Sequence, residues 1–427
     1  MLKTAKGQNI LLLLAGYVFY GLIEWRMLVL LLGMTIGVYL LGRSKVPVIW
    51  GVLFSLLPLV TLKYCTFLPG VGLIVPVGIS FFTFKLISYL VDIHRGKIAP
   101  TDDPIVFALY VSFFPTILSG PIDRPDFMRQ LAQPRHFDYY QSVVGCRMLL
   151  WGAFKKMVVA DTCAVYVNQA WAQLPDASGS TLALAAFLYA CQLYADFSGY
   201  SDMAIGLGRL LGLRVVPNFN VPFMAYNIAD FWRRWHMSLT GWLNDYVFTP
   251  LSLRFREDGR RGVALAAVIN MFLVGIWHGA SWTYVLFGLY HGLLLAVLIL
   301  TGRSRVPREA NRQSRWLHAM VTMCFCIIGW IIFRAPDMHS AMLYLSRMCS
   351  LSLFSVPALY GSLFSIEVIV FPLVMLVAEG LAACSAAHIA EYRLSHKWLR
   401  WTVYYLLVLA VWWAATKRPT DFIYFQF

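Results

Sequence analysis

Long apolar stretches recur along this chain of 427 residues, and they restrict its fold more than any other feature. A helix needs about 20 apolar residues to cross the hydrocarbon of a membrane. Stretches near that length cover residues 48–62, 71–91, 104–117, 182–194, 263–276, 284–300, 317–333, 366–383 and 401–415. The pattern predicts an all-α polytopic membrane protein with about 10–11 transmembrane or re-entrant helices plus short interfacial helices.

Composition and pattern exclude two other classes of protein. Hydrophobic residues make up 59% of the chain and charged residues 13%, so a soluble enzyme is a poor interpretation. An outer-membrane barrel would show short alternating strands instead of continuous apolar runs. Apolar residues 10–23 are followed at once by a second run, 27–41, with no clear cleavage site, so we expect a retained anchor. Without repeats or long linkers, residues 1–427 are expected to form one membrane domain.

The formal net charge of +14 is concentrated in short loops, which argues against nucleic-acid binding. Residues 254–261 hold four arginines and residues 303–315 hold five. Cytoplasmic loops of membrane proteins are rich in Lys and Arg, so we expect both loops in the cytoplasm. The apolar stretch between them must then cross the membrane and return to the cytoplasmic side. It is predicted to form a helical hairpin that turns near residues 279–282.

The cysteines show no spacing typical of a zinc site, and no metal is predicted. Most of them lie in or beside apolar runs, so we interpret all of them as small apolar packing residues. They are Cys65, Cys146, Cys163, Cys191, Cys324, Cys326, Cys349 and Cys384.

Polar residues interrupt the apolar pattern at residues 118–135, 194–202 and 218–250. In the second stretch, Asp196 and Asp202 need partners such as arginine or backbone donors, because an ionised carboxylate in a membrane is costly. They could orient a catalytic histidine or brace the fold, and we favour bracing. The third stretch predicts a short helix at or below the membrane surface, with Asp230 in its first turn, where a negative charge is favoured.

His278 is the leading candidate for chemistry, in the sequence Gly-Ile-Trp-His-Gly-Ala-Ser-Trp at 275–282. It falls near the predicted hairpin turn, where its small neighbours would let a substrate approach closely. A histidine inside a membrane domain is a candidate functional residue. The alternative is a histidine that is hydrogen-bonded in helix packing.

His236 is the second candidate, and its alternative is an interfacial histidine beside Trp235. His291 is more simply explained as structural. Arg233 and Arg234 could bind the phosphates of an anionic donor or could contact lipid headgroups.

These residues suit acyl transfer. A neutral histidine can take the proton of a hydroxyl that attacks a thioester or ester, and general-base help of this kind is worth roughly 10²–10⁴-fold in rate. The chain has no Gly-x-Ser-x-Gly elbow, no Walker loop, no Gly-x-Gly-x-x-Gly and no His-Glu-x-x-His motif.

Several motifs together resemble the membrane-bound O-acyltransferases (MBOAT), and within them the bacterial alginate O-acetylase branch. The two main ones are Asp-Phe-Trp-Arg-Arg-Trp-His-Met-Ser-Leu at 230–239 and the stretch around His278. Further matches are Pro-Val-Gly-Ile-Ser-Phe-Phe-Thr-Phe at 76–84, Ser-Tyr-Leu-Val-Asp at 88–92, Ser-Gly-Pro-Ile at 119–122, Tyr-Ala-Asp-Phe-Ser-Gly-Tyr-Ser-Asp-Met-Ala at 194–204 and Phe-Ile-Tyr-Phe-Gln-Phe at 422–427.

The resemblance implies an MBOAT-like helical enzyme in the bacterial inner membrane, with His278 and His236 at the positions of the family's two histidines. It implies acetyl-CoA as acyl donor, bound with help from Arg233, Arg234 and Trp277, and no permanently bound cofactor. It also implies a periplasmic partner, often an SGNH-type acetyltransferase, that completes transfer to a polysaccharide. Residues 250–262 lack the family's Gly-Gly-Asn-Arg stretch, so donor contacts are expected to differ there.

Two alternatives remain from the sequence. One is transfer of D-alanine from a carrier-protein thioester to teichoic acid, a branch that shares both histidines. The other is a proton-coupled transporter or flippase that uses intramembrane Asp and His residues as a relay, although the inverted repeats common in transporters are not evident.

Overall fold

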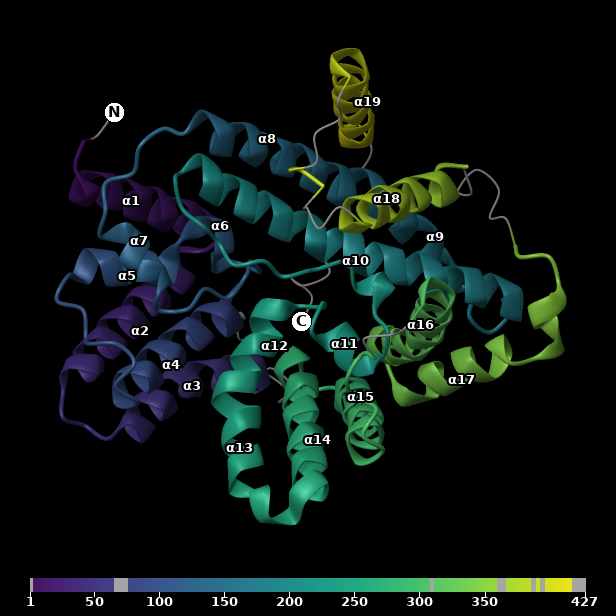
Figure 1. Cartoon of the computed structure of the whole chain (residues 1–427), viewed down its shortest axis with the longest axis horizontal. Coiled ribbons are helices and arrows are strands. Elements are labelled where there is room, and N and C mark those ends of the chain that lie inside the picture. Colours follow the sequence, from purple (N-terminus) through teal and green to yellow (C-terminus); the bar gives the residue numbers. More distant parts are fainter. Residues whose placement is uncertain are drawn as a thin grey trace. The chain divides into compact units, whose positions relative to one another are not determined.

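The computed structural model describes residues 3–64, 76–307, 311–358, 366–384, 389–391 and 396–416, and every regular element in these ranges is a helix (Figure 1). The predicted all-α fold is therefore confirmed. Cys65, residues 71–75 of one predicted apolar run and the ending at 422–427 lie outside the described residues. Cys163, Cys191 and Cys326 are buried, whereas Cys146, Cys324 and Cys349 are exposed.

Six helices in the described part of the chain are long and apolar enough to cross a membrane. They are α1 (Ala5–Ile23), α2 (Trp25–Arg43), α14 (Gly259–His278), α15 (Trp282–Leu300), α16 (Arg312–Arg334) and α19 (Lys397–Ala415). The chain is thus a multi-pass membrane protein. Other predicted segments form α3 (Val48–Tyr64), which is shorter, and α18 (Glu367–Cys384).

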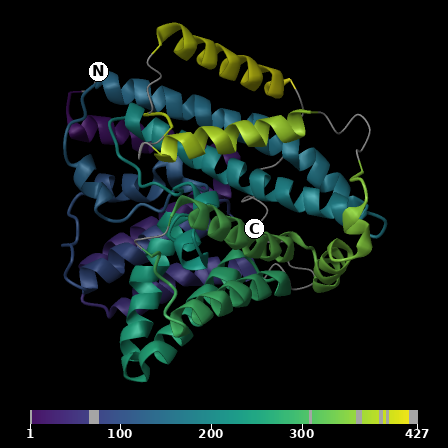
Figure 2. The same ribbon diagram turned by 45° about the vertical axis from the view of Figure 1, so that its right-hand side comes forward.

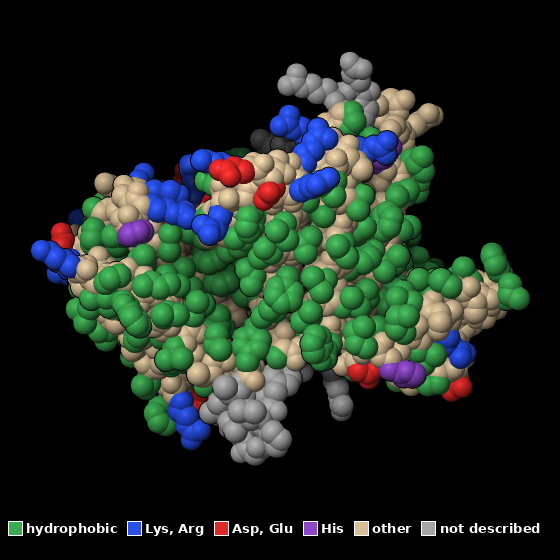
Figure 3. All heavy atoms as spheres, turned by 90° about the horizontal axis from the view of Figure 1, so that it is seen from below, with side chains coloured by type: hydrophobic (Ala, Val, Ile, Leu, Met, Phe, Trp, Pro, Cys, Tyr) green, Lys and Arg blue, Asp and Glu red, His purple; other side chains and the backbone are tan. Residues whose placement is uncertain are grey.

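The surface of the protein agrees with a lipid environment. Figure 3 shows hydrophobic side chains over most of the face that is seen, with charged side chains gathered toward its margins. Along α19, Trp398, Trp401 and Trp412 are all exposed. Exposed apolar area of this extent is unusual for a soluble monomer and is expected where lipid covers the protein.

The helices divide into two compact units. The first contains residues 1–149 and 203–217 and the second contains residues 150–202 and 218–427. The first unit holds α1–α3, α4 (Ile79–His94), α5 (Pro104–Ser112), α6 (Phe114–Ile117), α7 (Phe127–Leu131) and most of α8 (Tyr139–Ala153). Within it, the predicted run 104–117 breaks at Phe113, whose backbone leaves the helical region between α5 and α6.

The packing of the first unit requires the glycine in the motif at 76–84. Gly78 has a φ of +81°, and a Cβ there would lie 2.1 Å from the carbonyl oxygen of Ile117, so only glycine fits before α4. The α4 helix that follows is buried along nearly its whole length. Its Lys85 donates to Thr116 Oγ1 at 3.0 Å and to the carbonyl of Tyr110 at 3.3 Å.

The second unit begins with the end of α8, a π-helix, η2 (Phe154–Ala160), and α9 (Asp161–Ala172), followed by most of the long α10 (Gly179–Leu210). After α10 come η3 (Pro222–Met224), α11 (Ile228–Trp232), α12 (Met237–Leu243), a second π-helix η4 (Asn244–Phe248), α13 (Thr249–Arg254) and η5 (Arg256–Asp258). The unit ends with α14–α16, α17 (Met338–Met348), η6 (Leu351–Phe354), α18 and α19.

The predicted interruption at 194–202 is wrong, because α10 continues through these residues without a break. Its polar side chains do not end the helix because partners from neighbouring elements satisfy them. The predicted short helix in 218–250 is confirmed as α11, with Asp230 in its first turn and Asn227 as its N-cap.

The predicted hairpin is confirmed by α14 and α15, which lie side by side in Figures 1 and 2 and turn at residues 279–281. Glycines allow the close approach: a Cβ on Gly275 would lie 2.3 Å from Tyr284 O, and one on Gly288 would lie 2.4 Å from Met271 O. The tight hairpin fixes the C-terminal end of α14, where His278 stands.

Candidate active site

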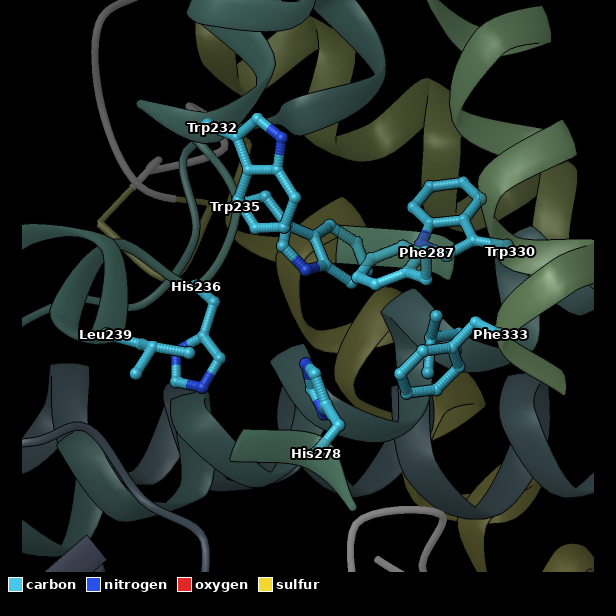
Figure 4. Close-up of a pocket in the computed structure, with 9 residues that line it drawn as sticks. Trp232, Trp235, His236, Leu239, His278, Phe287, Trp330 and Phe333 are labelled. Carbon is cyan, nitrogen blue, oxygen red and sulfur yellow. The ribbon is translucent and has the colours of Figure 1, made fainter. Parts of the chain in front are cut away.

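A pocket in the second unit brings His236 and His278 together (Figure 4). It has about 300 Å³ of space between its walls, including its open side. The other lining residues are apolar or aromatic: Leu193, Trp232, Trp235, Leu239, Phe287, Trp330 and Phe333. Both leading histidines of the sequence thus share one small, mostly apolar space.

His278 is the last residue of α14 and is buried. Its ring centroid lies 4.8 Å from that of Phe333 and 4.7 Å from that of Trp277. In the view of Figure 4 the imidazole lies between His236 and Phe333. Aromatic rings therefore pack against the imidazole on two sides.

The small residues around His278 serve helix packing more directly than substrate access. Gly275 lies against α15, and a Cβ on Gly279 would lie 2.8 Å from the Tyr284 ring. These small residues were expected to open a path to the imidazole. In the structure they let α14 end and turn in contact with Tyr284.

His236 stands between α11 and α12 in an unusual backbone conformation, with a φ of +44°. A residue other than glycine in this region costs about 1–3 kcal/mol, and such strain clusters at functional sites. The side chain is 1% exposed, and burial lowers the pKa of His236 to about 3, so the imidazole is neutral at physiological pH. His236 lies outside the candidate membrane spans.

Asn218 holds His236 in place, a role that was not predicted. His236 Nδ1 and Asn218 Oδ1 are 3.2 Å apart, and the backbone N–H of Met237 donates to the Asn218 carbonyl at 2.8 Å. Ser238 contacts the same amide oxygen through its hydroxyl at 2.6 Å. A buried asparagine in the polar stretch 218–250 was the available signal, but sequence alone does not show which side chain it meets.

Trp277 lies next to both histidines. Its ring centroid is 5.9 Å from that of His236 and 4.7 Å from that of His278, and the residue is 8% exposed. It was expected to contact the donor. The structure places it as a shared neighbour of the two imidazoles.

Arg233 and Arg234 both contact Asp230. The Nε of Arg234 is 3.0 Å from Asp230 Oδ2, which also accepts from the backbone N–H of Tyr226 at 3.0 Å. Arg233 is 3.6 Å from the other carboxylate oxygen and its side chain is 54% exposed, compared with 30% for Arg234. Asp230 therefore orients the pair, and Arg233 is the more accessible to an anionic ligand.

Asp202 belongs to a buried group of charges that we call the Lys155 cluster: Lys155, Asp202, Glu379, Tyr194 and Trp151. Lys155 Nζ is 2.6 Å from Asp202 and 3.0 Å from Glu379. The Tyr194 hydroxyl and Trp151 Nε1 both donate to Glu379. The cluster joins η2, α10, α18 and α8.

Asp196 has an equivalent partner in Lys156, at 2.8 Å, and Lys156 also meets Asp161 at 2.9 Å. The partners expected for Asp196 and Asp202 were arginine or backbone donors, whereas the structure supplies two adjacent lysines of a π-helix. Lysines and a glutamate within apolar runs were the signal that sequence analysis passed over. The geometry favours bracing.

His291 contacts two residues that line the pocket. The Trp232 indole N–H points to His291 Nδ1 at 3.4 Å, and the ring packs against Phe287 at 4.8 Å. This arrangement agrees with the structural role expected for it. Within the part of the chain that the structure describes, no group of three or more His, Cys, Asp or Glu residues could hold a metal ion.

The chain is similar to a family of known enzymes. Residues 101–336, which include both histidines, match the model of the membrane-bound O-acyltransferase family. The chain is 36% identical over 375 residues to the probable alginate O-acetylase AlgI of Pseudomonas aeruginosa. The match covers 80% of this chain and 69% of that protein.

Two other relatives act on different acceptors by name. The chain is 32% identical over 364 residues to the peptidoglycan O-acetyltransferase of Helicobacter pylori, covering 77% of this chain and 66% of that one. It is 30% identical over 311 residues to the teichoic acid D-alanyltransferase of Bacillus subtilis, covering 67% and 78%.

Proposed function

Because the chain belongs to the membrane-bound O-acyltransferase family and is an O-acyltransferase, we propose that it moves an acetyl group from cytoplasmic acetyl-CoA across the membrane for O-acetylation of an extracytoplasmic polysaccharide. The observation that carries this proposal is the pocket where two buried imidazoles face one small space between aromatic walls. The similarity to probable alginate O-acetylases favours acetyl as the group transferred.

His278 acts as the general base in this proposal. It takes the proton from an acceptor hydroxyl as the hydroxyl oxygen attacks the thioester carbonyl. When the tetrahedral intermediate collapses, the carbon–sulfur bond breaks and the CoA thiolate takes the proton back from His278. The products are an acetyl ester and CoA, and His236 positions the reacting groups.

The donor approaches from the arginine-rich ends of α13 and α14. Arg233, held by Asp230 and more exposed than Arg234, is suited to a phosphate of acetyl-CoA, as are the arginines at 254–261. Trp277 lines the approach to His278. The acceptor is a sugar hydroxyl or a periplasmic partner, such as an SGNH-type acetyltransferase, that relays the acetyl group, and the membrane is the bacterial inner membrane.

The second candidate is transfer of D-alanine from a carrier-protein thioester, supported by similarity to teichoic acid D-alanyltransferases at 30% identity. The acetylase relatives are more similar and match a larger part of this chain. The two candidates differ in donor and share the same general base.

The test uses purified protein in nanodiscs with acetyl-CoA carrying a radiolabelled acetyl group. Wild type should release CoA and transfer label, and His278→Ala should lose roughly 10²–10⁴-fold in turnover. His339→Ala, at an exposed histidine of α17, is the matched control and should match wild type. Turnover by His278→Ala at the wild-type rate would contradict the mechanism. Turnover with a D-alanyl carrier protein but not with acetyl-CoA would select the second candidate.

A further inference from the structure

The side-chain amide of Asn218 has a defined orientation. Its oxygen lies 3.3 Å from the backbone N–H of Ser238 and 2.6 Å from the Ser238 hydroxyl. A backbone N–H can only donate, so the atom that faces it must be the amide oxygen. The amide nitrogen then donates to Ser201 Oγ at 3.2 Å. All of these residues are buried, which makes the alternative orientation costly.

This orientation determines where the proton of His236 lies. Asn218 Oδ1 can only accept, and His236 Nδ1 is 3.2 Å away, so Nδ1 must carry the hydrogen. A neutral imidazole has one N–H group, and its other nitrogen then presents a lone pair. Burial keeps the ring neutral by lowering the pKa of His236 to about 3.

We propose that Asn218 is a positioning residue that fixes His236 as the Nδ1–H tautomer, so that Nε2 is a hydrogen-bond acceptor during acyl transfer. This inference rests on the proposed function. A thioester carbonyl oxygen can only accept hydrogen bonds, so the Nε2 lone pair cannot stabilise it. A reacting group that contacts Nε2 must therefore be a hydrogen-bond donor, while the proton of the attacking hydroxyl goes to His278.

Asn218 also fixes the position of the ring through the backbone. Its carbonyl accepts from Met237, the residue that follows His236, and the backbone N–H of Asn220 donates to the carbonyl of Arg234 at 3.0 Å. These two bonds bracket His236 and hold its left-handed backbone conformation. The same asparagine thus sets both the place of the imidazole and the nitrogen that faces away from Asn218.

A direct test measures the tautomer without any substrate. Protein with ¹³C- and ¹⁵N-labelled histidine is reconstituted in bilayers for solid-state NMR, and the His236 signals are identified by their loss in His236→Gln. We expect a protonated Nδ1 and an unprotonated Nε2 in wild type, and a mixture of tautomers in Asn218→Leu. A protonated Nε2 in wild type would overturn the inference, whether or not acetyl-CoA is the donor.

A double-mutant cycle then tests the functional consequence. Loss of the partner of a buried N–H should lower kcat of Asn218→Leu on the order of 10- to 100-fold, with little change in KM for acetyl-CoA. Asn218→Asp keeps an acceptor oxygen and should recover most of the rate. Ser201→Ala, which removes only the bond from the Asn218 amide nitrogen, should stay within about 3-fold of wild type.

The decisive comparison uses the His236→Gln background. If Asn218 acts through His236, Asn218→Leu should cause no further loss there. An equal loss in both backgrounds would show a purely structural role and overturn the proposal. Absence of CoA release by wild type would count against the proposed donor, and the NMR result would still decide the tautomer.

Discussion

The histidine pocket and the Lys155 cluster are both buried polar regions of the second unit, yet they satisfy their polar groups in opposite ways. In the cluster, one lysine meets two carboxylates at 2.6 and 3.0 Å, so the charges are compensated by each other. In the pocket, the imidazole of His236 is neutral and its other neighbours are mostly rings. Compensated charges leave little capacity for chemistry, whereas the neutral imidazole of His236 in an apolar space can still accept a hydrogen bond.

The comparison separates stability from catalysis. Changes in the Lys155 cluster should lower the amount of folded protein, while changes in the pocket should lower turnover or selectivity of the protein that does fold.

Lys155→Met should give the largest loss of stability. The substitution leaves Asp202 and Glu379 buried without their cation, and breaking a buried ion pair by removing one partner costs about 3–5 kcal/mol. Thermal unfolding followed by fluorescence-detected size exclusion should show a lower midpoint, with turnover per folded molecule close to wild type.

Glu379→Gln is the matched variant for this cluster. It keeps acceptor and donor atoms near Tyr194, Trp151 and Lys155 and removes one of two carboxylates that share the lysine. Its loss of stability should be smaller than that of Lys155→Met. A fully stable Lys155→Met protein with no turnover would instead assign the cluster a catalytic role. The division between a cluster for stability and a pocket for turnover would then be wrong.

Phe333→Ala should change selectivity for the acyl group. Phe333 is 3% exposed and its ring contacts the imidazole of His278 at 4.8 Å, so its removal enlarges the pocket beside the proposed base. A methylene in an apolar pocket is worth about 1–3 kcal/mol of discrimination, so the preference for acetyl-CoA over butyryl-CoA should fall roughly 10-fold or more.

The measurement is the ratio of kcat/KM for the two thioesters. Phe325→Ala, at an exposed phenylalanine of the same helix α16, is the control and should keep the wild-type ratio. An unchanged ratio in Phe333→Ala would mean that the acyl group does not occupy this side of the pocket.

The buried neutral His236 predicts a dependence of stability on pH. Its folded pKa of about 3 lies below the usual pKa of 6.5 for histidine, so between these values the unfolded state binds more protons. Stability from this group is present above about pH 6.5 and is lost as pH falls toward 3, by at most about 1.4 kcal/mol per pH unit.

The check is the slope of the unfolding free energy against pH for wild type and His236→Gln. Subtracting the two curves isolates His236 from other buried histidines. The variant should be less sensitive between pH 6.5 and 5. Identical slopes would mean that folding does not shift the pKa of His236, which would remove the argument that burial keeps its imidazole neutral.

Sequence reasoning was most successful where local signals decide structure. Apolar runs between arginine-rich loops predicted the α14–α15 hairpin and its turn, and an acidic residue before an aromatic stretch predicted α11 with Asp230 in its first turn. Periodicity and charge placement carry such information because they act within one element.

It failed where the answer depends on partners distant in the chain. The stretch 194–202 was predicted to interrupt a span, because isolated carboxylates end apolar helices, but Lys155 and Lys156 satisfy them and α10 continues. Asn218 was missed for the same reason, because its contact with His236 forms only when the chain folds and brings the two residues together.

The smallest predicted effect distinguishes the two adjacent arginines next to the pocket. Arg234 is the closer to Asp230 and the less exposed, so Arg234→Ala should reduce stability slightly, by less than about 1 kcal/mol. Arg233→Ala should leave stability unchanged and raise KM for acetyl-CoA a few-fold at constant kcat, because a contact made equally in ground and transition states affects binding alone. Added salt should weaken wild-type binding more than binding by Arg233→Ala. If KM is unchanged in Arg233→Ala while retention of the protein in anionic bilayers falls, then Arg233 contacts lipid headgroups, and the donor phosphates must be held by the arginines at 254–261.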